Sequence, residues 1–186
     1  MISAILAIDQ AEISGVALGS LLDHAQLSRA IICTVKGAPE RSDVARAAIE
    51  LCAGDVSSLA VVFEDHGGFK FSRGNMSVRS VMGMGAARGR WLEALELVGV
   101  KTSRIYRVSP ETWRGAVLGL SKRVKADVAK AKAVEWARAV TGMVEVQTDA
   151  AEALAILHWA ARNLPAQIEA SKAAAAIARK RAKGAA

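Results

Sequence analysis

Two short apolar runs in this chain each end on a carboxylate, and this feature most restricts how the chain can fold. Over residues 2–8 every residue except Ser3 is apolar, and Asp9 follows. The run "SLAVVFED" (58–65) is likewise apolar up to Glu64. Both runs have the length and composition of buried strands. Because an unpaired buried carboxylate is strongly destabilising, each acid must be paired, hydrogen-bonded or bound to a metal ion.

The remaining sequence predicts further strands first and then alternating helices and strands. We expect strands over residues 2–9, 14–21, 27–35, 58–65 and 103–109. We expect helices from Pro39 to just before Gly54, and over 81–98, 110–118, 125–140 and 148–163. Residues 66–80 form a glycine-rich basic loop between them. This order predicts an α/β fold with a five-stranded mixed sheet, strands 1–3 antiparallel, flanked by helices.

Composition places the chain among globular proteins with one core. Its 186 residues are 52% hydrophobic and 23% charged, which suits a single domain. No apolar run approaches the roughly 18 residues that a membrane span needs. The two cysteines, Cys33 and Cys52, lack metal-ligand spacing and are expected to be core thiols in a reducing compartment. We therefore expect a cytoplasmic protein, in a bacterial or phage-infected cell.

The net charge of +7 is distributed unevenly along the chain. Residues 66–132 carry fourteen Lys or Arg and four acids, and the end of the chain adds Lys172, Arg179, Lys180, Arg181 and Lys183. The rest is net acidic. A basic middle and a basic end on an otherwise acidic protein indicate a polyanionic partner. The alternative is a basic face that is only solvated.

Four carboxylates are candidate metal ligands. Asp9 and Glu64 end strands that would be neighbours, while Asp149 and Glu152 lie three apart at the start of a helix and share a face. Such a cluster needs cations, and hard oxygen ligands favour Mg²⁺ or Mn²⁺. Two ions roughly 4 Å apart can clamp a phosphodiester. Taken singly, each acid has a simpler interpretation: a solvated strand end, or an acid favoured at a helix start.

Several blocks of the sequence together resemble one family. "ILAID…SGVAL", "AVVFED", "GMGAARGRWLEAL", "VSPETWRGAVLGL…K" and "DAAEALAILHWA" occur in the order of the blocks of RuvC-like Holliday junction resolvases, nearest to the phage and prophage branch. The resemblance covers roughly residues 2–162. It implies a ribonuclease H-like fold and a dimer that uses Mg²⁺ to nick two opposed strands of a four-way DNA junction.

The resemblance also assigns roles to residues. It makes Asp9, Glu64, Asp149 and Glu152 the metal ligands and catalytic acids, with Mn²⁺ expected to substitute for Mg²⁺. Glutamate at 152 departs from the aspartate usual in cellular members. The family's "DPG" is "DQA" here, and the small-residue turn is delayed to residues 14–15. The family lysine that approaches the scissile phosphate matches Lys125, with Lys122 and Arg123 as open alternatives.

Further residues are expected to touch DNA or to pack the core. The expected DNA contacts are Phe69, Lys70, Phe71, Arg73, Arg79, Arg88, Lys122, Arg123 and Lys125. The two phenylalanines are placed to stack on opened bases or, equally, to anchor the loop in the core. His66, two residues beyond Glu64, is expected to be a loop residue, with assistance in proton transfer as the alternative. Trp113, Trp136 and Trp159 are expected in the core, with His158 in it or at its edge.

These observations predict a metal-dependent, structure-selective endonuclease that acts on Holliday junctions or other branched DNA in recombination or phage DNA processing. Residues 1–165 would form the nuclease domain and 166–186 a basic C-terminal helix or tail. A homodimer joined through the 81–98 helix would supply paired cuts. The alternatives are a catalytically inert branched-DNA binding module and an actin-like phosphotransferase, although the chain is too short for the two domains of the latter.

Overall fold

The computed structural model of the chain describes residues 2–21, 29–65 and 78–184. Its centre is a five-stranded sheet in the order β3-β2-β1-β4-β5. The strands are β1 (Ala4–Asp9), β2 (Ser14–Ser20), β3 (Ile31–Val35), β4 (Leu59–Glu64) and β5 (Ile105–Val108). The first three pair antiparallel, whereas β4 runs parallel to β1 and β5 parallel to β4. The predicted mixed sheet is therefore confirmed.

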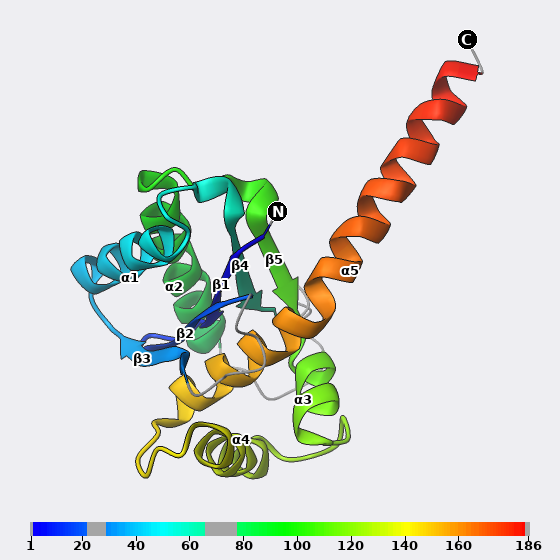
Figure 1. The fold of residues 1–186 in the computed structure, drawn as a ribbon. Helices are drawn as coiled ribbons and strands as arrows, with labels where there is room; N and C mark the ends of the chain where they lie inside the picture. Colours follow the sequence, from blue (N-terminus) through cyan, green and yellow to red (C-terminus); the bar gives the residue numbers. More distant parts are fainter. Residues whose placement is uncertain (1, 22–28, 66–77, 185–186) are drawn as a thin grey trace.

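Helices cover both faces of this sheet (Figure 1). The helices are α1 (Ala38–Leu51), α2 (Val78–Leu97), α3 (Pro110–Leu118), α4 (Ala126–Thr141) and α5 (Thr148–Gly184), with 3₁₀ turns η2 (Val56–Ser58) and η3 (Thr102–Arg104) before β4 and β5. Successive strand residues point to opposite faces. Leu6 and Ile8 accordingly pack with α1 and α2, while Ile5 and Ala7 pack with α3, α4 and α5.

The helix expected over 148–163 is longer than the sequence predicted. Helix α5 continues through Pro165 to Gly184, and its C-terminal half projects away from the sheet (Figure 1). Leu164 is buried, whereas most residues from 165 to 178 are exposed. Proline removes one backbone donor, but the alanine-rich sequence that follows has the highest helix propensity. None of the described helices combines the length and apolar character needed to cross a bilayer.

The predicted core tryptophans lie where the sequence placed them. Trp113 and Trp159 are buried, and the partly buried Trp136 packs against the same core, beside the ring of His158. Trp91 is also fully buried, on the opposite face of the sheet. Both cysteines are free, Cys52 buried and Cys33 half-buried.

Candidate metal centre

The carboxyl ends of two adjacent parallel strands bring Asp9 and Glu64 to one edge of the sheet. Strands β1 and β4 are in register, with Ile8 opposite Phe63, and each strand ends at the next residue. The two carboxylates are 8% and 3% exposed, respectively. Ligand sites form at the carboxyl ends of parallel strands because these strand ends lie together and the chain then turns away.

The start of α5 lies against the same edge. Thr34 on β3 donates a hydrogen bond of 2.6 Å to the side chain of Gln147, just before the helix. Asp149 and Glu152 follow on one face of the first turn. Each of Asp9, Asp149 and Glu152 offers one ligand atom, and these atoms all lie within 4.8 Å of one another.

This concentration of negative charge has electrostatic consequences. Burial raises the pKa of Asp9 well above its usual value, and repulsion from the other three carboxylates, that of Glu64 first, raises it further. A side-chain hydrogen bond between Asp9 and Glu64 acts in the same direction. Burial also raises the pKa of Glu152, although Arg114 and Lys130 oppose the rise. Without a bound metal ion, the burial and mutual repulsion of these carboxylates therefore lower the stability of the folded protein.

Helix α3 begins and ends at positions that its sequence specifies. Ser109 is the N-cap, and its hydroxyl accepts a hydrogen bond of 3.3 Å from the backbone N–H of Thr112. Pro110 occupies the first helical position, where no backbone donor is needed. Gly119 ends the helix with φ of 66°, a left-handed conformation that favours glycine. The helix therefore has fixed limits beside the carboxylates.

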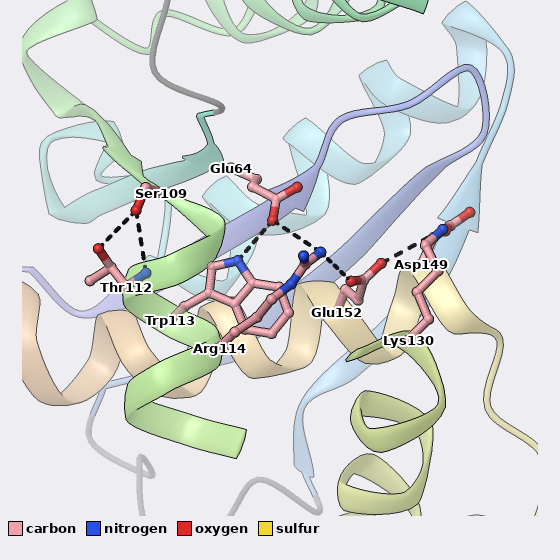
Figure 2. A network of polar contacts seen from close by, with 8 residues as sticks. All are labelled: Glu64, Ser109, Thr112, Trp113, Arg114, Lys130, Asp149 and Glu152. Atoms are coloured by element: carbon pink, nitrogen blue, oxygen red, sulfur yellow. Dashed lines mark hydrogen bonds and ion pairs between the residues drawn. The ribbon is translucent and has the colours of Figure 1, made fainter. Parts of the chain in front are cut away.

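Two consecutive residues of α3 reach the carboxylates (Figure 2). The indole Nε1 of Trp113 donates a hydrogen bond of 2.9 Å to Oε1 of Glu64. Arg114 donates from Nη2 to Oε1 of Glu152 at 2.8 Å, and the same nitrogen lies 3.8 Å from Oε1 of Glu64. The Arg114 guanidinium also lies over the Trp113 ring, 5.1 Å from its centroid. Sequence reasoning assigned Trp113 only to the core and did not select Arg114.

A lysine of α4 completes the polar network. The Nζ atom of Lys130 lies 3.6 Å from Oδ1 of Asp149 and 3.9 Å from Oε2 of Glu152 (Figure 2). Lys130 was not among the sequence candidates. The selected Lys125 is the exposed N-cap residue of α4, with no cap hydrogen bond from its side chain. The two lysines are five residues apart, and spacing alone gave no means of choosing between them.

The remaining candidates are placed only in part. Lys122 and Arg123 are exposed in the turn before α4, and Arg88 is half-buried on α2. Arg79 belongs to the first turn of α2, and nothing is described of its side chain. The other candidates fall outside the described residues: His66, Phe69, Lys70, Phe71 and Arg73. Their roles stay predictions.

Comparison with known proteins places the fold. No family model matches the sequence, and no curated protein matches it. Among solved structures, T. thermophilus RuvC in complex with Holliday junction substrate is similar at 18% identity, with a TM-score of 0.54, over 84% of this chain and 91% of that one. The chain has the ribonuclease H-like fold of RuvC. A second Thermus thermophilus RuvC structure matches at 19% identity and a TM-score of 0.47, over 89% and 96% of the two chains.

Within this RuvC-like fold, the carboxylate cluster fits a divalent cation. The donors are all carboxylate oxygens, which hard cations such as Mg²⁺ and Mn²⁺ prefer. Asp9 and Glu152 are buried, and Asp149 is 28% exposed, which leaves a side from which an ion can enter. A bound cation would remove the repulsion that raises the pKa of Asp9. The geometry thus supports a metal site without identifying the ion.

Proposed function

We propose that the protein is a metal-dependent endonuclease that nicks opposed strands of four-way junctions or other branched DNA in recombination or phage DNA processing. The observation that carries the proposal is the buried cluster of Asp9, Asp149 and Glu152 at the carboxyl end of β1, in a fold shared with RuvC. We also propose that the protein belongs with phage and prophage resolvases, because its sequence blocks resemble that branch and residue 152 is glutamate instead of the aspartate usual in cellular members.

Each residue of the centre has a defined task in this proposal. Asp9, Asp149 and Glu152 would hold one ion, and Glu64 would contribute to a second. Magnesium or manganese would supply an activated water and stabilisation of the departing 3′ oxygen. Trp113 holds the Glu64 carboxylate in place through its indole N–H. Lys130 or Lys125 would then neutralise charge that develops on the phosphate.

The basic segment before α4 is the proposed path of the DNA backbone. Lys122, Arg123 and Lys125 are exposed side by side in sequence, and Lys130 follows on the helix next to the carboxylates. Lysine and arginine side chains bind DNA chiefly by neutralising phosphates. A strand that follows this segment would bring its phosphates toward the carboxylates of α5.

Paired cuts require a second active site, and we propose that a homodimer supplies it. A closed two-fold dimer relates two identical sites through one interface. The proposed contact is α2, where "VMGMGAARG" combines small residues with an exposed Met82. Among the described residues, no atom lies within 4 Å of a Cβ added at Gly83 or Gly89. In this part of the chain, close packing within the protomer does not account for these two glycines.

The deciding experiment compares labelled four-way junction, fork and linear duplex, with Mg²⁺ and with a chelator. We expect the wild-type protein to nick the junction symmetrically only when Mg²⁺ is present. Asp9→Asn should lower the rate by roughly 10² to 10³ or more, as removal of a transition-state charge contact does. Junction binding should persist, because a negative charge facing DNA has been removed.

The matched control is Asp43→Asn. Asp43 is an exposed acid of α1 that pairs with Arg46, and its removal should leave cleavage unchanged. Near-normal nicking by Asp9→Asn would refute the assignment. Selective junction binding with no cleavage under any divalent ion would instead support the inert binding module.

A further inference from the structure

The four carboxylates form two unequal halves around Arg114. On one side, Asp9, Asp149 and Glu152 present ligand atoms within 4.8 Å of one another. On the other side, Oε1 of Glu64 and Oε1 of Glu152 both face Nη2 of Arg114, at 3.8 Å and 2.8 Å. Figure 2 shows the guanidinium between these two carboxylates. The space between the Glu64 and Glu152 carboxylates is thus occupied by a protein cation.

Arg114 is well fixed in this position. Its guanidinium lies over the Trp113 ring, and Trp113 itself donates to Glu64, so that both residues converge on the same carboxylate. The Arg114 side chain is 22% exposed, and no described residue forms a hydrogen bond with its buried Nε. Arginine side chains stay charged at physiological pH and hold carboxylates with directed hydrogen bonds. Repulsion between the guanidinium and a divalent ion disfavours their simultaneous binding to the same two oxygens.

We propose that Arg114 takes the place of the second metal ion in the DNA-free protein, so that the centre binds one divalent cation until Arg114 moves away. This inference rests on the proposed metal-dependent function and adds a rule for how the centre is loaded. The first ion binds to Asp9, Asp149 and Glu152. The second requires Glu64 and Glu152, and therefore the departure of Arg114. A DNA phosphate is a suitable alternative partner, because guanidinium groups bind phosphate as well as carboxylate.

The test counts Mn²⁺ ions bound to the DNA-free protein by titration calorimetry and by electron paramagnetic resonance. We expect one ion per chain for wild type and two for Arg114→Met, whose two neighbouring Mn²⁺ ions should show spin coupling. Arg114→Lys keeps the positive charge and should bind one ion. The matched control is Arg107→Met, which removes the same charge from an exposed pair with Asp65 and should also bind one. Two ions in wild type, or one in Arg114→Met, would overturn the proposal.

A second pair of variants tests the proposal even if Arg114→Met does not fold. In an otherwise wild-type chain, Glu64→Gln should still bind one Mn²⁺, because the first ion does not need Glu64. Asp149→Asn should lose Mn²⁺ binding. Loss of the ion in Glu64→Gln would overturn the inference while leaving the proposed nuclease intact, provided that wild type still cleaves junctions. Wild-type protein that neither binds Mn²⁺ nor cleaves DNA would refute the nuclease and this inference together.

Discussion

At the scale of single residues, Gly15 permits the closest approach in the candidate site. It lies opposite Asp9 in the β1–β2 pair. A Cβ at this position would lie 1.8 Å from the carbonyl oxygen of Asp149 and 2.8 Å from the backbone nitrogen of Ala150. Because these are backbone atoms, no side-chain rotation could relieve the overlap. The first turn of α5 can approach Asp9 of β1 only because residue 15 has no side chain.

Gly15→Ala should therefore separate α5 from β1. We expect a loss of about 3 kcal/mol in unfolding free energy, at the upper end for overpacking, together with loss of Mn²⁺ binding. The control is Gly19→Ala in the same strand, where the nearest atom is the Leu157 Cδ2 methyl carbon at 3.0 Å. That side chain can turn aside, so stability should fall by only about 1 kcal/mol with the metal site retained. Chemical denaturation and calorimetry measure both effects, and equal metal affinity in the two variants would contradict this reading of Gly15.

Trp113 joins the core to the site, and its two contributions can be separated. Trp113→Phe retains a buried ring but removes the N–H that holds Glu64. We expect a stability loss of roughly 1.5–3 kcal/mol, the value of a hydrogen bond to a charged group, and a lower cleavage rate. Trp91→Phe is the control, because its indole donates to Ser14 Oγ at 3.0 Å on the other face of the sheet. Trp91→Phe should destabilise the protein without a comparable loss of cleavage rate per folded molecule. Equal losses of cleavage rate in the two variants would argue against a positioning role for Trp113.

At the scale of secondary-structure elements, α2 has an unusual composition for a helix of 20 residues. Glycine inside a helix costs about 1 kcal/mol relative to alanine, yet α2 contains Gly83, Gly85 and Gly89. No atom of the described residues lies within 4 Å of a Cβ added at Gly83 or Gly89. Trp91 and Leu95, in contrast, are fully buried against the sheet. The helix thus combines one face that packs against the sheet with a small-residue stretch whose Met82 and Ala86 are exposed.

Ala86→Glu tests whether this stretch joins two copies. Ala86 is exposed, so the protomer should fold normally. A buried charge at a close helix contact would block the dimer, and we expect a monomer that nicks one strand without resolving the junction. Sedimentation at micromolar concentration is the direct measurement. Leu97→Glu, at an exposed position at the end of α2, is the control and should remain dimeric; coordinated paired cuts by a monomeric protein would exclude this role for the interface.

At the scale of the whole molecule, α5 connects the carboxylate cluster to a distant basic end. The helix begins at Asp149 and Glu152 of this cluster, crosses the sheet and continues beyond it for several turns (Figure 1). Ile168 is the last of its residues that packs against the core cluster. The segment from Lys172 onward carries five basic residues and no acid. This end lies far from the carboxylates (Figure 1), so under the proposed function it would contact a second region of the DNA.

Removing this end should change how DNA binding responds to salt. Deletion after Ser171 leaves the packed part of α5 in place, and we expect the slope of log K against log salt to fall by about 0.9 for each lost phosphate contact. Replacing Lys172 and the four later basic residues with glutamine, at full length, should reproduce the loss. Filter binding or fluorescence anisotropy over a range of NaCl concentrations gives the slope. An unchanged slope in both proteins would mean that this end is only solvated.

The sequence by itself determined the strands, the end of the sheet at which Asp9 and Glu64 lie, and the mixed character of the sheet. An apolar run, whether alternating or continuous, indicates a buried strand. Strands β1 and β4 each end on the acid that follows such a run. Helix α3 has the predicted limits because Ser109, Pro110 and Gly119 act on the backbone next to them. These signals depend only on neighbouring residues, so they can be read from the sequence without the tertiary structure. Helix α5 runs past its expected end at residue 163 because the alanine-rich segment beyond Pro165 has a high helix propensity.

Only the tertiary structure decided which residues surround the carboxylates. Arg114 meets Glu152 across 38 positions of sequence, and Trp113 meets Glu64 across 49. Such pairs depend on where α3 and α5 cross the end of the sheet, which follows from packing across the whole core. Gly15 shows the same dependence, since its lack of a side chain matters only once the backbone of Asp149 lies against it. The sequence shows which acids are candidate metal ligands. Tertiary packing determines which side chains lie next to them.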